Sequence, residues 1–237
     1  MAATMDRRVF LGLALAGIAG TLPVTACGRG AGSDVQLDPT PPRPQAGRGR
    51  ILLAYFSRPG ENYWYGGRRN LEVGNTEVLA RMISARLDCD VHRIEAVDPY
   101  PDGYDETVAR NVREQEADAR PAIAHPLPSI AQYNAVLLAS PIWNVRAPMI
   151  MSTFADRYDF AGKTVFPITT YAMSGLGTTP DDYRRSCKGA RIGRGLAVRG
   201  EEVRSAEAVV DSWLRRVRLL QTRRSEEQRR HEWTSER

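Results

Sequence analysis

Short apolar runs alternate along the chain with segments whose apolar residues recur at helical spacing. The first run, residues 51–56, is apolar throughout, which is typical of a strand buried on both faces of a sheet. Residues 90–95 alternate apolar and polar positions and are predicted to form an edge strand. Three further strands are expected at residues 135–140, 164–169 and 192–198.

The predicted helices lie between these strands. The first opens at Gly74-Asn75-Thr76, where Asn75 or Thr76 is expected to cap it. Strands that alternate with helices indicate a three-layer, doubly wound α/β fold around a five-stranded parallel sheet. Ligands of such sheets bind at the carboxyl ends of the strands. The remaining helices are predicted at residues 104–119, 148–155, 180–186 and 201–219.

The N-terminal end of the chain departs from this pattern. Residues 1–27 place Arg7-Arg8 before a short apolar run that ends in Val24-Thr25-Ala26-Cys27. This order resembles a twin-arginine export signal followed by a bacterial lipobox. We therefore expect export, with lipid on Cys27 and anchoring on the outer face of the bacterial cell membrane. A plain cleaved signal with a coincidental cysteine is the alternative.

The other segments complete the predicted domain organisation. Residues 28–49 are rich in proline and glycine and are expected to form a tether. Residues 50–219 form the folded domain, and residues 220–237 are a charged tail without apolar periodicity.

Charge and composition exclude several function classes. The net charge of +5 is spread over scattered arginines without a basic stripe, so nucleic-acid binding is not expected. The three histidines are too dispersed for a metal site, and no serine-hydrolase elbow or P-loop occurs. Cys89 and Cys187 could pair in an oxidising compartment, although two small buried thiols are the favoured interpretation.

Three loops at predicted strand ends carry the candidate chemistry. Ser57 and the helix start at Asn75-Thr76 offer hydroxyl groups and free N–H groups to a phosphate, with an ordinary helix cap as the alternative. In the second loop, Trp143 could stack on a flat ring or pack as a lid over the core. The third loop, residues 169–178, is small and glycine-rich, so its backbone can approach a ligand closely.

Together these loops resemble the flavodoxin-like family over about residues 50–218. The matching segments are Tyr55-Phe56-Ser57-Arg58, Gly74-Asn75-Thr76, Ser140-Pro141-Ile142-Trp143, Phe160-Ala161-Gly162-Lys163-Thr164 and Ser174-Gly175-Leu176-Gly177. The resemblance implies a sheet of strand order 2-1-3-4-5 and a non-covalent FMN. It places the FMN phosphate on Ser57, Asn75 and Thr76. It implies that the flavin ring is bordered by Ile142, Trp143, Asn144, Thr170, Ser174 and Gly175, and Arg58, Pro141 and Gly177 complete the candidate binding residues.

The phosphate loop departs from that of short flavodoxins through an insert at residues 58–73. The insert could be a lid over the flavin, with Arg68 or Arg69 on the phosphate, or it could fill the site. The chain is also basic, so the docking that acidic flavodoxins use with basic partners is not expected.

The sequence therefore predicts an FMN-binding redox protein outside the cytoplasm. It would transfer electrons to a partner protein or reduce a small molecule such as a quinone. The alternative is a cofactor-free binding lipoprotein on the same scaffold. The twin-arginine signal favours the redox protein, because a cofactor loaded in the cytoplasm must cross the membrane inside a folded protein.

Overall fold

The computed structural model describes residues 50–220. The predicted export signal, the tether and residues 221–237 of the charged tail lie outside these residues. No helix within the described range is both long and apolar enough to cross a membrane.

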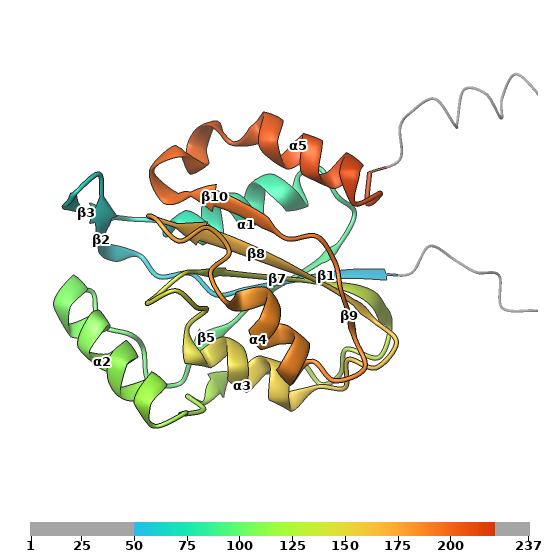
Figure 1. Cartoon of the computed structure of the whole chain (residues 1–237), viewed down its shortest axis with the longest axis horizontal. Helices are drawn as coiled ribbons and strands as arrows, with labels where there is room; N and C mark the ends of the chain where they lie inside the picture. Colours follow the sequence, from blue (N-terminus) through green and yellow to red (C-terminus); the bar gives the residue numbers. More distant parts are fainter. Residues whose placement is uncertain (1–49, 221–237) are drawn as a thin grey trace, which may run out of the picture. The chain divides into compact units, whose positions relative to one another are not determined.

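A parallel sheet of five principal strands forms the centre of the domain (Figure 1). Its spatial order is β10-β8-β7-β1-β4, which confirms the predicted order 2-1-3-4-5 when the five strands are counted along the chain. The edge position predicted for the second of them is also confirmed. The strands are β1 (Arg50–Tyr55), β4 (Asp90–Arg93), β7 (Tyr133–Pro141), β8 (Thr164–Tyr171) and β10 (Leu196–Arg199).

The strand predicted at residues 192–198 is split in two. A short strand, β9 (Arg191–Ile192), pairs with the start of β8, and β10 pairs with its end. The glycines between them lie against neighbours: a Cβ at Gly193 would come within 2.5 Å of the Phe166 ring, and one at Gly195 within 2.8 Å of the Leu176 side chain. The chain therefore leaves the ladder where only glycine fits.

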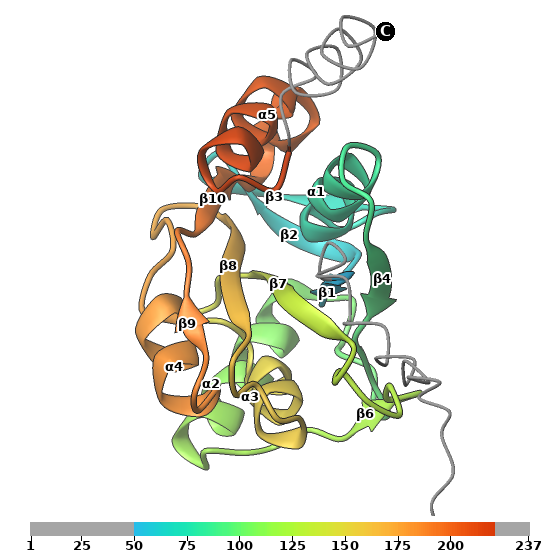
Figure 2. The same ribbon diagram turned by 90° about the vertical axis from the view of Figure 1, so that its right-hand side faces the viewer.

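Helices cover both faces of the sheet and give three layers (Figure 2). Helices α1 (Asn75–Ser84) and α5 (Glu207–Arg216) cover one face, and α3 (Met149–Arg157) and α4 (Thr179–Ser186) the other. Successive residues of β1 alternate between the two cores, since Leu52 packs on the α3 side and Leu53 on the α1 side. This alternation explains why β1 is apolar throughout. Helix α2 (Tyr104–Glu116) lies beside α3 and next to the inserted hairpin.

The cap residue predicted for α1 and the start predicted for the last helix were wrong, although α1 opens where expected. Gly74, rather than Asn75 or Thr76, is the N-cap residue of α1, and the first-turn N–H of Glu77 is bonded instead by Ser57 Oγ at 3.0 Å. The predicted helix at 201–219 begins as a 3₁₀ turn, η1 (Gly200–Ser205), before α5. Val203 of the turn is buried in the same core as α5, so the apolar spacing continues across the break and could not reveal it.

The insert in the first loop folds as a β-hairpin. Its strands are β2 (Gly60–Trp64) and β3 (Gly67–Leu71), joined by Tyr65 and Gly66, both of which have positive φ. A two-residue turn of this kind matches the twist of the flanking strands. A second small antiparallel pair is formed by β5 (Glu95–Ala96) and β6 (Ile123–Ala124).

The two cysteines of the domain are free thiols on opposite faces of the sheet. Cys89 packs against the α1 side, whereas Cys187 belongs to the core on the α3 side. Burial raises the pKa of the Cys89 thiol to about 11 and that of Cys187 to about 12. The sheet therefore separates two thiols that sequence alone could not place.

Candidate functional site

A cavity of about 260 Å³ opens at the carboxyl ends of β1, β7, β8 and β10. It lies at the switch point of the sheet, where chain connections leave in opposite directions. Its volume is slightly below that of typical small-molecule pockets, so it suits a ligand that stays partly exposed. Nine predicted site residues line it: Ser57, Arg58, Asn75, Thr76, Pro141, Ile142, Trp143, Asn144 and Thr170.

The other three predicted site residues do not line the cavity. Gly175 accepts a hydrogen bond from Thr169 Oγ1 at 2.9 Å through its carbonyl, and the N–H of Gly177 donates to Ser174 at 2.8 Å. A Cβ at Gly177 would lie 2.0 Å from the carbonyl oxygen of Val145. These residues brace the neighbouring loop, so the prediction that Ser174, Gly175 and Gly177 touch a ligand stays a prediction.

Two further walls complete the cavity. The hairpin contributes Asn62 and Tyr63, in keeping with the lid that was one of the two alternatives for the insert, whereas the wall from α2 was not predicted. Thr107 and Asn111 are buried polar residues spaced four apart on α2, and this spacing was a usable signal for a polar helix face turned inward. The full set of unpredicted lining residues is Asn62, Tyr63, Tyr104, Thr107, Val108, Asn111, Tyr171, Ala172, Met173, Gly200 and Glu201.

One end of the cavity carries hydroxyl groups beside a helix N-terminus. Thr76 Oγ1 and Thr170 Oγ1 share a hydrogen bond of 2.7 Å, which ties the first loop to the third. The first N–H groups of α1 have no partner within the helix and carry a partial positive charge. A Cβ at Gly74 would lie 2.4 Å from both Ser57 Oγ and the Arg58 carbonyl oxygen, so the loop closes tightly only with glycine there. This end suits an anion.

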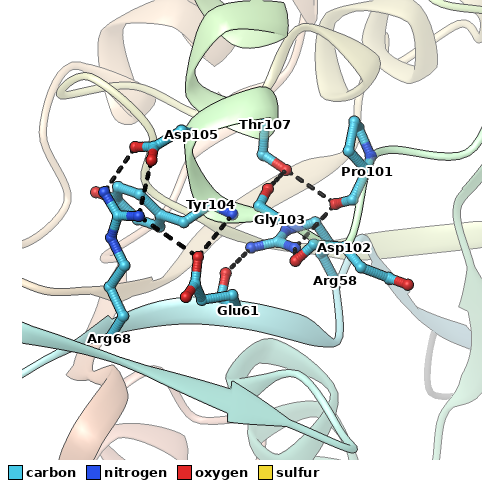
Figure 3. A network of polar contacts seen from close by, with 9 residues as sticks. All are labelled: Arg58, Glu61, Arg68, Pro101, Asp102, Gly103, Tyr104, Asp105 and Thr107. Atoms are coloured by element: carbon cyan, nitrogen blue, oxygen red, sulfur yellow. Dashed lines mark hydrogen bonds and ion pairs between the residues drawn. The ribbon is translucent and has the colours of Figure 1, made fainter.

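Arg58 supplies a buried positive charge between the hairpin and the start of α2. It is one of the residues that line the cavity, and it is only 7% exposed. The guanidinium donates to the carbonyl oxygens of Pro101 at 3.0 Å, Asp102 at 2.9 Å and Glu61 (Figure 3). All these acceptors are neutral backbone groups, and Nε is buried without a partner. Burial lowers the pKa of Arg58, although a guanidinium stays protonated, so its charge is only partly compensated.

The hairpin is fixed to the start of α2 by a polar network (Figure 3). Glu61 Oε2 accepts the N–H of Tyr104 at 3.1 Å, at the first residue of the helix. Arg68 makes two hydrogen bonds to Asp105, at 2.8 and 2.6 Å, and lies over the Tyr104 ring. The bond to Arg68 lowers the pKa of the Asp105 carboxyl group.

The side chains of the two hairpin arginines therefore interact with other residues of the protein, and none of these interactions involves the hydroxyl groups of Thr76 and Thr170. Arg68 is held by Asp105, and the Arg69 guanidinium lies 4.6 Å from the centre of the Trp64 ring. The far end of the hairpin is held where Glu201 Oε1 accepts the N–H of Tyr65 at 3.1 Å. The insert thus forms a wall of the cavity and leaves the space open, which favours the lid over the occluding insert.

Trp143 packs on the core and also lines the cavity, so stacking on a flat ring stays a prediction. Its indole packs edge-on against Phe56 and Tyr100, with ring centres 5.7 and 5.2 Å away, and it also lines the cavity. Backbone hydrogen bonds between Trp143 and Arg146 close a tight turn over Asn144 and Val145, both at positive φ. The left-handed conformation is strained for a β-branched valine. The turn holds the tryptophan rigidly at the cavity edge.

The fold and this cavity define a doubly wound α/β protein. We call the end of the cavity with Ser57, Thr76 and Thr170, which suits an anion, the anion seat, and Trp143 lines the cavity beside it. A family model described as Flavodoxin matches residues 70–217, more than half of the chain. The chain therefore belongs to this flavodoxin family. The match begins inside β3 and leaves β1 and most of the hairpin outside it.

Solved structures give the same fold. A protein of Bacteroides eggerthii DSM 20697, described provisionally as a flavoprotein, is 26% identical, with a TM-score of 0.58 over 71% of this chain and 97% of its own. A provisionally named flavoprotein of Bacteroides uniformis ATCC 8492 is also 26% identical, with a TM-score of 0.56, and the match covers 70% of this chain and 98% of that one. A Lactobacillus acidophilus NCFM flavoprotein solved with FMN is 15% identical, with a TM-score of 0.50 over 70% of this chain and 98% of its own. No curated protein matches the chain.

Proposed function

We propose that the protein binds FMN non-covalently in this cavity and uses it for redox chemistry. The observation that carries the proposal is one cavity lined by the α1 N-terminus, the Thr76–Thr170 hydroxyl pair and Trp143. Hydroxyl groups and free N–H groups at a helix N-terminus favour an anion such as a phosphate. Membership of the flavodoxin family and the FMN bound to the Lactobacillus protein support the same ligand.

The residues present fit the parts of FMN. Ser57, Asn75, Thr76 and Arg58 would hold the phosphate, and Ile142, Trp143 and Asn144 would border the ring. When bound, the flavin supplies the electron-transfer chemistry. The chain's own residues bind and orient it: Trp143 offers an aromatic face, and the hairpin and α2 exclude water from one side.

Purification of the full chain tests the proposal directly. A yellow protein whose visible spectrum shows flavin absorption, or an apoprotein that binds added FMN with a sub-micromolar to micromolar Kd, is the expected result. A protein that neither carries nor binds FMN under these conditions would favour the cofactor-free binding lipoprotein.

For the electron acceptor we propose a redox partner protein or a small planar molecule such as a quinone. The support is the open cavity, which leaves part of a bound ring accessible. Rapid-mixing measurements with the reduced protein would distinguish the two classes, since a reductase reoxidises with a soluble quinone whereas a dedicated carrier needs its protein partner.

Replacing Trp143 with alanine is expected to weaken FMN binding by about 1–3 kcal/mol, the loss typical of one aromatic stacking contact. The expected change in Kd is roughly five- to 150-fold and is measured by quenching of flavin fluorescence. Trp143→Phe keeps an aromatic face and should retain most of the affinity. An unchanged Kd for Trp143→Ala would show that the indole only packs against Phe56 and Tyr100.

We further propose that the protein is exported folded and anchored by lipid on Cys27. The support is the Arg7-Arg8 pair and the Val24-Thr25-Ala26-Cys27 sequence. Cys27→Ser should abolish incorporation of labelled fatty acid and release the protein from the membrane fraction. Replacing Arg7 and Arg8 with lysines preserves the charge but should block export through a twin-arginine machinery. Labelling or membrane retention of Cys27→Ser at the wild-type level would contradict the lipid anchor.

A further inference from the structure

Asn111 is a buried polar side chain of the cavity whose donor is unused by the protein. The residue is 2% exposed and lies on the inward face of α2. Among residues 50–220 its only side-chain hydrogen bond is the one that Oδ1 accepts from Gln115 Nε2, at 3.2 Å. Asn111 lines the cavity, so its Nδ2–H groups can donate to an acceptor on a ligand there.

A short hydrogen-bond chain fixes which end of the Asn111 amide faces the cavity. The backbone carbonyl of Trp143 can only accept, and Gln115 Nε2 donates to it at 3.1 Å. The NH₂ group of Gln115 therefore lies on this side. The same nitrogen also contacts Asn111, so Asn111 accepts this hydrogen bond with its Oδ1. The Asn111 NH₂ group is thereby turned away from Gln115.

The same chain places Asn111 at the ring end of the cavity. Gln115 joins it to the backbone of Trp143, whereas the anion seat is formed by Ser57, Thr76 and Thr170 at the other end. The neighbouring walls, Val108 and Ile142, are apolar. An amide donor next to these walls can bond the edge of a ring that packs against them.

We propose that Asn111 is a positioning residue for the flavin, which donates its Nδ2–H to an acceptor atom on the edge of the ring. This inference rests on the proposed FMN binding. Reduction adds electron density to the ring and makes its edge a stronger hydrogen-bond acceptor. The Asn111 donor therefore favours reduced over oxidised FMN and raises the reduction potential.

Two substitutions separate this role from a structural one. Asn111→Leu has nearly the same size and removes the donor without adding charge. Asn111→Asp keeps an oxygen for Gln115, so the link to Trp143 survives, but it replaces the donor with a carboxylate. Both should lower the ratio of affinities for reduced and oxidised FMN, about tenfold for leucine, which is about 30 mV for a two-electron couple, and by more for aspartate.

The experiment measures Kd for oxidised FMN by titration of the apoprotein and the midpoint potential by dye-coupled titration of the full-length holoprotein. Gln115→Leu is the matched control, since it removes the orienting bond but not the donor, and should shift the potential less than Asn111→Leu. Wild-type potentials in both Asn111 variants, or equal loss of affinity for both redox forms, would overturn the inference. A wild-type protein that binds no FMN would instead refute the proposed function itself.

Discussion

Arg58→Ala is expected to raise the Kd for FMN on the order of 100-fold, because it removes a buried positive charge from the residues that line the cavity. Part of this loss is specific to the phosphate. Riboflavin has the same ring without the phosphate, so its Kd should rise much less. Isothermal titration of the apoprotein with both ligands measures the difference.

Arg58 also bonds the hairpin through the Glu61 carbonyl, so the experiment has to separate the loss of this bond from the loss of charge. Removing the side chain leaves the carbonyl groups of Glu61, Pro101 and Asp102 without their donor, so the apoprotein should also lose stability. Arg58→Lys keeps the charge but cannot present a planar fork to three acceptors. It should therefore retain more FMN selectivity than Arg58→Ala while being similarly destabilised. Equal losses for FMN and riboflavin in Arg58→Ala would show that Arg58 only positions the hairpin.

Gly177→Ala is expected to lower the free energy of unfolding by about 2–4 kcal/mol. The backbone there has φ +52°, and the added Cβ would lie 2.0 Å from the Val145 carbonyl oxygen. That oxygen also accepts the N–H of Thr178 at 2.8 Å, so the turn that carries Trp143 cannot move away without losing this bond. Thermal unfolding should show a decrease in Tm of roughly 5–15 °C.

Gly175→Ala is the matched control for this experiment. Gly175 has φ +59°, but an added Cβ would meet nothing within 4 Å. It should therefore cost only the strain of a left-handed alanine, about 1–2 kcal/mol. If Gly177→Ala were no more destabilising than Gly175→Ala, the contact with Val145 would not be a constraint on the loop. A loosened Trp143 turn should also weaken FMN binding in Gly177→Ala.

Most of the central fold could be predicted from the sequence because its signals are local. The continuous apolar run of residues 51–56 follows from the two faces that β1 buries. The edge position of β4 is also as predicted, although its apolar residue Val91 is exposed and its polar residues Asp90 and His92 are half-buried. The break between β9 and β10 was not predictable in detail, since it depends on the Phe166 ring and the Leu176 side chain lying where a Cβ would be. The 3₁₀ start of the last helix was hidden by apolar spacing that continues through it.

Part of the candidate site could likewise be predicted from local sequence, and the rest depends on contacts between distant segments. Loops after β1, β7 and β8 were found because a parallel sheet brings the carboxyl ends of its strands to one edge. The wall from α2 was missed, and the role of the hairpin was left open, because Tyr63, Tyr104 and Asn111 belong to segments whose sequence does not say where they dock. Their docking depends on Arg58, Glu61 and Arg68, which bond partners about 40 residues away in the chain.

The sequence by itself determined the strand and helix types, the family resemblance and the three loops, since each depends on residue order over short distances. Only the tertiary structure decided that the insert is a wall rather than a plug, and that Gly177 packs against the Val145 backbone. It also decided that Asn111 lines the cavity. These outcomes depend on contacts between distant segments, whose geometry is set by packing and hydrogen bonding across the whole domain.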